Sequence, residues 1–274
     1  MKLDTWRSLF GDPKLIFIII SLSAIGWCLP VAVQSKSSIF YGLGIIYNQK
    51  NSAGQTRCAD FRNLVAVNLL APDDGAKTLS SRPTFYWYIE HKSLNDEKSE
   101  KSFYLDFFLR GNVSPHAKSI YTSRSNRILH NNSGLYKFTL PPDSPSLEVG
   151  QTYTWHIRYI QSDGRERDLN GSQIDTRAIV LLESNPSVMK QINEASTDLE
   201  KARIFASNRY WYDALDAYTK WIEANPSDPI ALRERLSMLD EIIERNAKQK
   251  CAVKYNIDNS SLVNSTRSIE QVMK

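Results

Sequence analysis

The sequence predicts an α+β protein: an antiparallel β-sandwich, immunoglobulin-like in outline, followed by a small helical hairpin or three-helix segment. Two observations lead to this prediction. Between residues 64 and 182, apolar and polar residues alternate with period two in several short runs, and turn residues separate the runs. After residue 184, apolar residues recur at helical spacing. Successive strands without intervening helices are typical of a sandwich or barrel.

Two segments, 84–90 and 102–110, are the clearest strands. Each carries apolar side chains on one face at every second position, namely Phe85, Trp87, Ile89, Phe103, Leu105, Phe107 and Leu109. The charged loop between them, residues 92–101, predicts that they pair as antiparallel neighbours. Further strands are expected at residues 64–70, 119–122, 134–140, 152–161 and 177–182.

Helical spacing begins after Ser187, a candidate N-cap. Apolar stripes then indicate three helices, over residues 188–206, 211–222 and 229–243. The third opens with Asp228 and Pro229, an N-cap followed by proline at the first helical position.

These patterns divide the chain into five parts. We expect a signal peptide or N-terminal membrane anchor at 1–35, a flexible linker at 36–55, the β-sandwich domain at 56–183, the helical segment at 184–247 and a loose tail at 248–274. Within the linker, residues 39–47 form a short apolar patch. This patch either belongs to the tether or forms a short strand that docks on the domain.

The N-terminal segment predicts export. Leu15–Val33 is a run of 19 residues without charge, and Lys2, Arg7 and Lys14 precede it. Basic residues before an apolar stretch are the pattern of a secretory signal, but about 20 apolar residues also suffice to span a bilayer. A cleaved signal peptide and a retained transmembrane anchor therefore both remain open. In either case the positive-inside rule places the rest of the chain outside the cytoplasm, in the periplasm or cell envelope.

The chain has three cysteines. Cys28 follows Trp27, which is too large for a lipidation motif. Cys58 and Cys251 either form a disulfide in an oxidising compartment or are two free thiols, because a sequence cannot show that they meet. Their spacing, with no clustered histidine, argues against a zinc site.

No motif of catalysis or cofactor binding occurs in the sequence. The histidines stand outside every metal or nucleophile motif, so we expect solvated surface residues at His91, His116, His130 and His156. Glycine-rich nucleotide-binding loops are absent as well. We therefore predict no catalytic residue, no metal and no cofactor. The net charge is +4 and the basic and acidic residues are interspersed, which argues against binding to nucleic acid.

Aromatic side chains on the second face of the strands are the unusual feature. Tyr86, Tyr88 and Tyr104 lie opposite the predicted core face. If they are exposed, they can stack on sugar rings or contact a partner protein. We favour the alternative that the C-terminal helices bury them, because those helices need an apolar surface to cover. Trp211 and Tyr218 on the second helix are likewise partner contacts or, more simply, core residues.

Residues 212–218 (YDALDAY), followed by 225–229 (NPSDP), resemble the second helix and exit turn of a tetratricopeptide repeat. In such a repeat the small residues Ala214 and Ala217 would let two helices approach closely. About one and a half repeats are visible, fewer than a self-standing solenoid needs. The helical segment would therefore have to pack on the β domain or on a partner.

Taken whole, the chain resembles the cyanobacterial family called domain of unknown function 928. The segments that carry this resemblance are Thr56–Cys58, Thr78–Ser80, Arg82–Tyr88, Leu147–Gly150, Thr152–Trp155 and Arg209–Leu215. Many members have a second cysteine after the strand that contains Trp155, and this chain has none there. The resemblance implies an exported protein without an established activity, and it supplies no catalytic residues.

The functional expectation follows from these points together. We expect a non-enzymatic envelope protein outside the cytoplasm that acts as a protein-interaction or scaffold module, with an unknown envelope protein as its partner. It would also contact the membrane through its N-terminal segment if that segment is not cleaved. The alternative is a carbohydrate-binding module that uses the aromatic face of the β domain to hold a glycan.

Overall fold

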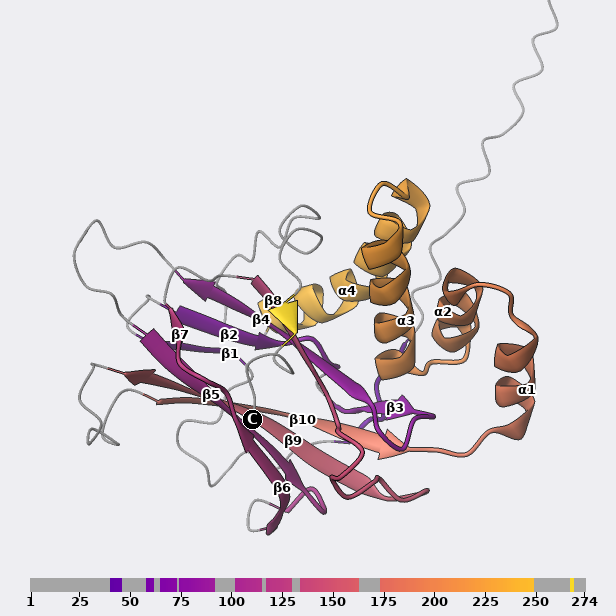
Figure 1. Ribbon diagram of the computed structural model, residues 1–274. Helices are drawn as coiled ribbons and strands as arrows, with labels where there is room; N and C mark the ends of the chain where they lie inside the picture. The colour runs from indigo at the N-terminus through magenta and orange to yellow at the C-terminus, as the bar shows by residue number, and fades with distance from the viewer. Residues whose placement is uncertain are drawn as a thin grey trace, which may run out of the picture. The chain divides into compact units, whose positions relative to one another are not determined.

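The computed structural model describes residues 40–45, 58–61, 65–72, 74–91, 102–114, 117–129, 134–162, 173–248 and 267–268. They form a mixed α+β structure with two β-sheets and four helices, which confirms the predicted class (Figure 1). No helix within these ranges is both long and apolar enough to cross a membrane. The predicted signal or anchor at 15–33 lies outside the described residues.

The first sheet has the strand order β1-β2-β4-β8-β11, and its strands span Cys58–Phe61, Val65–Leu69, Thr84–His91, Gly134–Thr139 and Arg267–Ser268. The second has the order β3-β10-β9-β5-β6, with bounds Ala76–Thr78, Gln173–Leu182, Thr152–Ser162, Ser102–Arg110 and Ser119–Arg124. A short strand, β7 (Ile128–Leu129), also pairs with β5.

Aromatic rings from both sheets meet in the core. Phe85 of β4 lies 5.3 Å from Phe107 of β5 and 4.8 Å from Trp155 of β9, measured between ring centroids. Phe138 of β8 lies 4.5 Å from Phe107. All four side chains are buried. The period-two pattern therefore correctly identified the inward face of β4 and β5.

The prediction that residues 84–90 and 102–110 pair with each other was wrong. β4 pairs with β2 and β8 in the first sheet, whereas β5 pairs with β9 and β6 in the second. The chain crosses between the sheets after β4, so the two apolar faces meet across the core instead of along one sheet.

The sheets are also not purely antiparallel. β3 pairs in parallel with β10, and β11 pairs in parallel with β8. β3 reaches the edge of the second sheet after a turn at Gly75, whose φ of +86° suits glycine. An added Cβ there would lie only 3.0 Å from the side chain of Ile179 on β10.

The described residues contain four helices where the spacing predicted three. They are α1 (Pro186–Glu194), α2 (Asp198–Ser207), α3 (Trp211–Ala224) and α4 (Pro229–Lys248). The stripe over 188–206 is broken because Thr197 caps α2: its hydroxyl accepts from the backbone N–H of Glu200, and the Glu200 carboxylate accepts from the Ser196 N–H. This reciprocal arrangement resembles a capping box and starts a new helix.

Part of the apolar patch near the N-terminus is docked on the β domain. Leu43 N–H donates to the Gly75 carbonyl at 3.1 Å, and Ile45 N–H donates to the Asp74 carbonyl at 3.2 Å. Tyr41 packs edge-on against Trp211 of α3, with 5.0 Å between ring centroids. Residues 40–45 thus behave as a docked segment and not as a loose tether.

Candidate functional site

The N-terminal end of α3 is anchored between the two sheets. The indole N–H of Trp211 donates to the Leu70 carbonyl, just past β2, at 2.9 Å. The hydroxyl of Tyr212 donates to the Ile179 carbonyl and accepts from the indole N–H of Trp155, each at 2.9 Å. Both α3 side chains are buried, so their polar atoms need these partners. Helix α3 is therefore joined to both sheets.

Further along, α3 packs on the outer face of the first sheet. Tyr86 of β4 donates its hydroxyl proton to Asp216 at 2.8 Å, and Lys220 pairs with the same carboxylate at 2.7 Å. Burial, and then the charge of Asp216, raise the pKa of Tyr86 well above its usual value. Lys137 of β8 reaches Glu223 at 2.9 Å. These polar contacts fix the helix over β4 and β8.

A buried arginine lies on α4 close to this contact. Arg235 is 1% exposed, and its Nη1 lies 3.5 Å from the hydroxyl of Thr219. Within the described part of the chain, its Nε and Nη2 atoms have no hydrogen-bond partner. Burial lowers the pKa of its guanidinium to about 10, although Tyr86 and Glu223 oppose the change. Arg235 is thus a desolvated cation to which none of the carboxylates in the described residues is directly bound.

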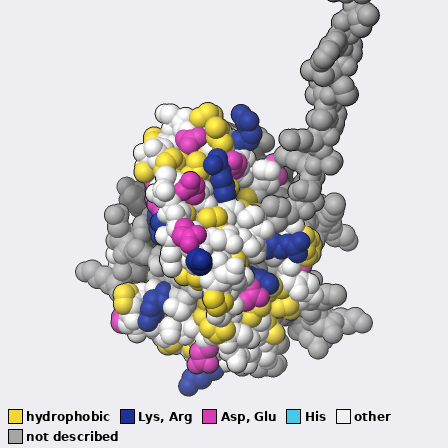
Figure 2. All heavy atoms as spheres, turned by 90° about the vertical axis from the view of Figure 1, so that its right-hand side faces the viewer, with side chains coloured by type: hydrophobic (Ala, Val, Ile, Leu, Met, Phe, Trp, Pro, Cys, Tyr) yellow, Lys and Arg dark blue, Asp and Glu magenta, His cyan; other side chains and the backbone are white. Residues whose placement is uncertain are grey.

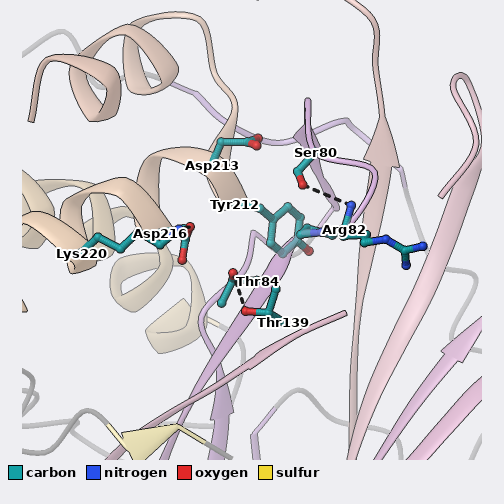
Figure 3. Close-up of a pocket in the computed structure, with 9 residues that line it drawn as sticks. Ser80, Arg82, Thr84, Thr139, Tyr212, Asp213, Asp216 and Lys220 are labelled. Atoms are coloured by element: carbon teal, nitrogen blue, oxygen red, sulfur yellow. Dashed lines mark hydrogen bonds and ion pairs between the residues drawn. The ribbon is translucent and has the colours of Figure 1, made fainter. Parts of the chain in front are cut away.

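A small polar pocket lies where α3 meets the first sheet (Figure 3). Its volume is about 160 Å³, and it is lined by Ser80, Arg82, Pro83, Thr84, Thr139, Tyr212, Asp213, Asp216 and Lys220. The hydroxyls of Thr84 and Thr139 bond to each other at 2.9 Å. The guanidinium of Arg82 points away from the pocket and binds the carbonyls of Pro141 and Ser144.

The two carboxylates of this pocket differ in environment. Asp213 accepts from the backbone N–H of Leu79 at 2.9 Å, and burial raises its pKa to about 6. Asp216 is bound by Tyr86 and Lys220. Both therefore already hold α3 against the sheet. The pocket is also smaller than the roughly 300–1,000 Å³ of ordinary ligand sites, so it fits a few waters or a very small polar molecule.

Most of the predicted contact residues are core residues. Tyr86, Tyr88, Trp211 and Tyr218 are all less than 9% exposed. The hydroxyl of Tyr218 binds Glu234 of α4 at 3.2 Å. Only Tyr104 of this set is partly exposed. The tyrosine rings on β4 consequently offer no open face on which a sugar could stack, and α3 covers that side of the strand as the burial alternative expected.

The predicted cysteine pair is not brought together in the described residues. Cys58 begins β1, while Cys251 lies outside the described ranges. The disulfide stays a prediction. Groups of three or more possible metal-ligating residues are absent from the part of the chain that the structure describes.

The expectation of solvated histidines was wrong for His156, which is 1% exposed on β9. The side chain does point away from the core. However, the register places Phe108 and Arg177 on either side of it, and long neighbouring side chains shield the ring from water. His91 ends β4, and His116 and His130 lie outside the described residues.

The fold and its contacts define a two-sheet α+β protein whose helical segment is hydrogen-bonded to both sheets. The chain belongs to the family described as Domain of Unknown Function (DUF928), whose model matches residues 52–250. The match covers both sheets and the four helices, apart from the short strand β11 and residues 40–45. A comparison with curated proteins found no match.

Proposed function

We propose that this protein is a non-enzymatic module of the bacterial cell envelope that binds a partner protein through its helices. The observation that carries the proposal is the attachment of α3 to both sheets by Trp211 and Tyr212. A helix fixed in this way holds its neighbours α2 and α4 in one rigid arrangement. Rigid presentation lowers the entropy that a binding surface loses when its partner docks.

Under this proposal the helical segment packs as a tetratricopeptide-like unit. Small side chains lie at the contact between α2 and α3, where Ala202, Ala206, Ala214 and Ala217 are all buried. Stacked helix pairs of this kind present extended surfaces that bind other proteins. Here the sandwich, immunoglobulin-like in outline under this proposal, supplies the packing that further repeats would supply in a solenoid.

We place the partner surface on α2 and α4. Arg203 of α2 forms a two-pronged ion pair with Glu234 of α4, at 2.9 and 3.0 Å, so the two helices approach each other at this point. Ser207 and Ser237, each about one turn beyond its ion-paired residue, are exposed. Figure 2, which views the molecule from its helical side, shows hydrophobic, basic and acidic side chains interspersed. Mixed surfaces of this kind are typical of partners that bind reversibly.

The location and the lack of catalysis rest on separate evidence. Leu15–Val33 with its preceding basic residues favours a place outside the cytoplasm. Asp213 and Asp216 already serve as anchors of α3, which supports a binding role over a catalytic one. The buried rings of Tyr86 and Tyr88 also favour a protein partner over a glycan.

Site-specific photocrosslinking in the native host tests the proposal. Ser207→p-benzoylphenylalanine and Ser237→p-benzoylphenylalanine should give the same discrete adduct, while Thr122→p-benzoylphenylalanine on β6 should not. A second change, Ser237→Arg, should abolish the adduct from position 207, and Thr122→Arg should leave it intact. Equal adducts from the helices and from β6, or no adduct from either helix, would contradict a partner surface on α2 and α4.

A further inference from the structure

The outer face of the second sheet is unusually rich in charge. Among the described residues of β5, β6, β9 and β10, six charged side chains and one histidine face away from the core: Arg110, Arg124, Arg158, Arg177, Asp106, Asp175 and His156. Four arginines against two aspartates leave this set with a net positive charge. The helices lie beside the first sheet and the end of the sandwich, away from β5, β6 and β9 (Figure 1).

His156 lies in the middle of this face. On one side the register sets it opposite Phe108 of β5, and on the other side opposite Arg177 of β10. Two residues along β9, Arg158 binds Asp175 at 3.0 Å and holds its guanidinium 4.8 Å from the centroid of the Phe108 ring. The same Asp175 lies 3.1 Å from Nδ1 of His156. One aspartate thus orients both the imidazole and an arginine.

The other nitrogen of this imidazole is unusual. Among the described residues, Nε2 of His156 is buried without a hydrogen-bond partner, and so is Nε of Arg158. Buried polar atoms nearly always have a hydrogen-bond partner, so two unsatisfied nitrogens on one charged face need an explanation. The contact with Asp175 sets Nδ1 as the N–H donor of the neutral ring, which leaves Nε2 to face a ligand or a proton.

We propose that this face binds an oxyanion, a carboxylate, phosphate or sulfate group, held by the guanidinium groups of Arg158 and Arg177 and by the imidazole of His156. Guanidinium forks match the paired oxygens of such groups and bind them through charge-assisted hydrogen bonds. Arg110 adds positive charge from β5. Bound there, the anion accepts from Nε of Arg158 and, once the imidazole is protonated, from Nε2 of His156.

Binding of the anion is coupled to protonation of His156. Burial lowers the pKa of His156, Asp175 raises it, and Arg110 and Arg177 lower it further. Asp106 and Arg158 are the other charged groups next to it on the face. An anion between the arginines offsets their repulsion of the imidazolium and raises the pKa. By linkage, the affinity for the anion increases as the pH falls through the pKa of His156.

The test is an NMR titration of the full chain that follows the histidine Cε1–H signals, with His156→Gln to identify the signal. Sodium phosphate should shift the His156 signal saturably and raise its pKa, while sodium chloride at equal ionic strength should not. Arg177→Gln should weaken phosphate binding by about tenfold, as expected for one charge-assisted hydrogen bond. Arg233→Gln, the same change on exposed α4, should bind like the unchanged protein.

Two further probes identify the source of the anion. Tighter binding of an oligogalacturonate than of phosphate would indicate an acidic glycan, and tighter binding of phosphate or sulfate would indicate a tetrahedral oxyanion. Thermal melting of each variant confirms that it is folded. The proposal is overturned if no oxyanion acts differently from chloride, or if Arg177→Gln and Arg233→Gln bind phosphate equally in folded protein.

Discussion

The hydroxyl of Tyr212 joins α3 to the second sheet, and its removal should destabilise the whole protein. Tyr212→Phe leaves the indole N–H of Trp155 without its acceptor and the Ile179 carbonyl without this donor, inside the core. Each buried polar group deprived of a partner costs about 1–3 kcal/mol. We expect the free energy of unfolding to fall by about 2–4 kcal/mol. In a protein of this size that corresponds to a lower Tm by roughly 5–10 °C.

Urea unfolding followed by tryptophan fluorescence measures this change. Tyr104→Phe is the matched control, because Tyr104 is partly exposed on β5, and its free energy of unfolding should change by less than about 0.5 kcal/mol. A double-mutant cycle with Trp155→Phe should give a coupling energy of about 1 kcal/mol or more. A loss below 0.5 kcal/mol for Tyr212→Phe, or no coupling to Trp155, would refute the view that this contact anchors the helices.

Three other predictions concern charged groups. The pKa of Asp213 is raised from 3.8 to about 6, so the folded state binds the proton of this carboxyl more tightly, and stability falls as the pH rises from about 4 to 6. Asp213→Asn should remove up to about 2 kcal/mol of that loss of stability. Urea midpoints that change equally between pH 4.5 and pH 7 in both proteins would contradict this prediction. Arg235→Met should leave stability unchanged or raise it, because the guanidinium is desolvated and no carboxylate of the described residues binds it. A loss of stability above about 1 kcal/mol would show that Arg235 has a stabilising role. Arg203→Ala breaks a largely exposed ion pair with Glu234, so thermal melting should show a loss of unfolding free energy below about 1 kcal/mol. A larger loss would mean that this ion pair holds α2 and α4 together.

Local patterns predicted the faces of the strands but not which sheet each strand joins. The alternation in β4 correctly separates Phe85 from Tyr86, because successive side chains must point to opposite sides. Both are buried since the second sheet covers one side and α3 the other. The pairing of β4 with β8 instead of β5 depends on residues far apart in the chain, and a charged loop carries no information about it.

One feature that the sequence analysis missed, the break between α1 and α2, is visible in the sequence. The break between α1 and α2 is encoded by Thr197 and Glu200, a threonine followed three residues later by glutamate, before an apolar run. The pocket had no such signal, because residues 80–84 and Thr139 meet residues 212–220 only after the sheets have formed. Burial of His156 depends likewise on Phe108 and Arg177, which the strand register alone brings beside it.

The anchoring of α3 also constrains how the protein can be made. Trp211 binds Leu70, and Asp213 binds Leu79, across 141 and 134 positions of the chain. During synthesis from the N-terminus, the strands are made before α3, the helix that covers one end of the two sheets. Until then the rings around Phe85 lack the edge-on cover of Tyr212. The incomplete sheets therefore expose an aromatic end, and we expect them to aggregate more readily than the complete chain.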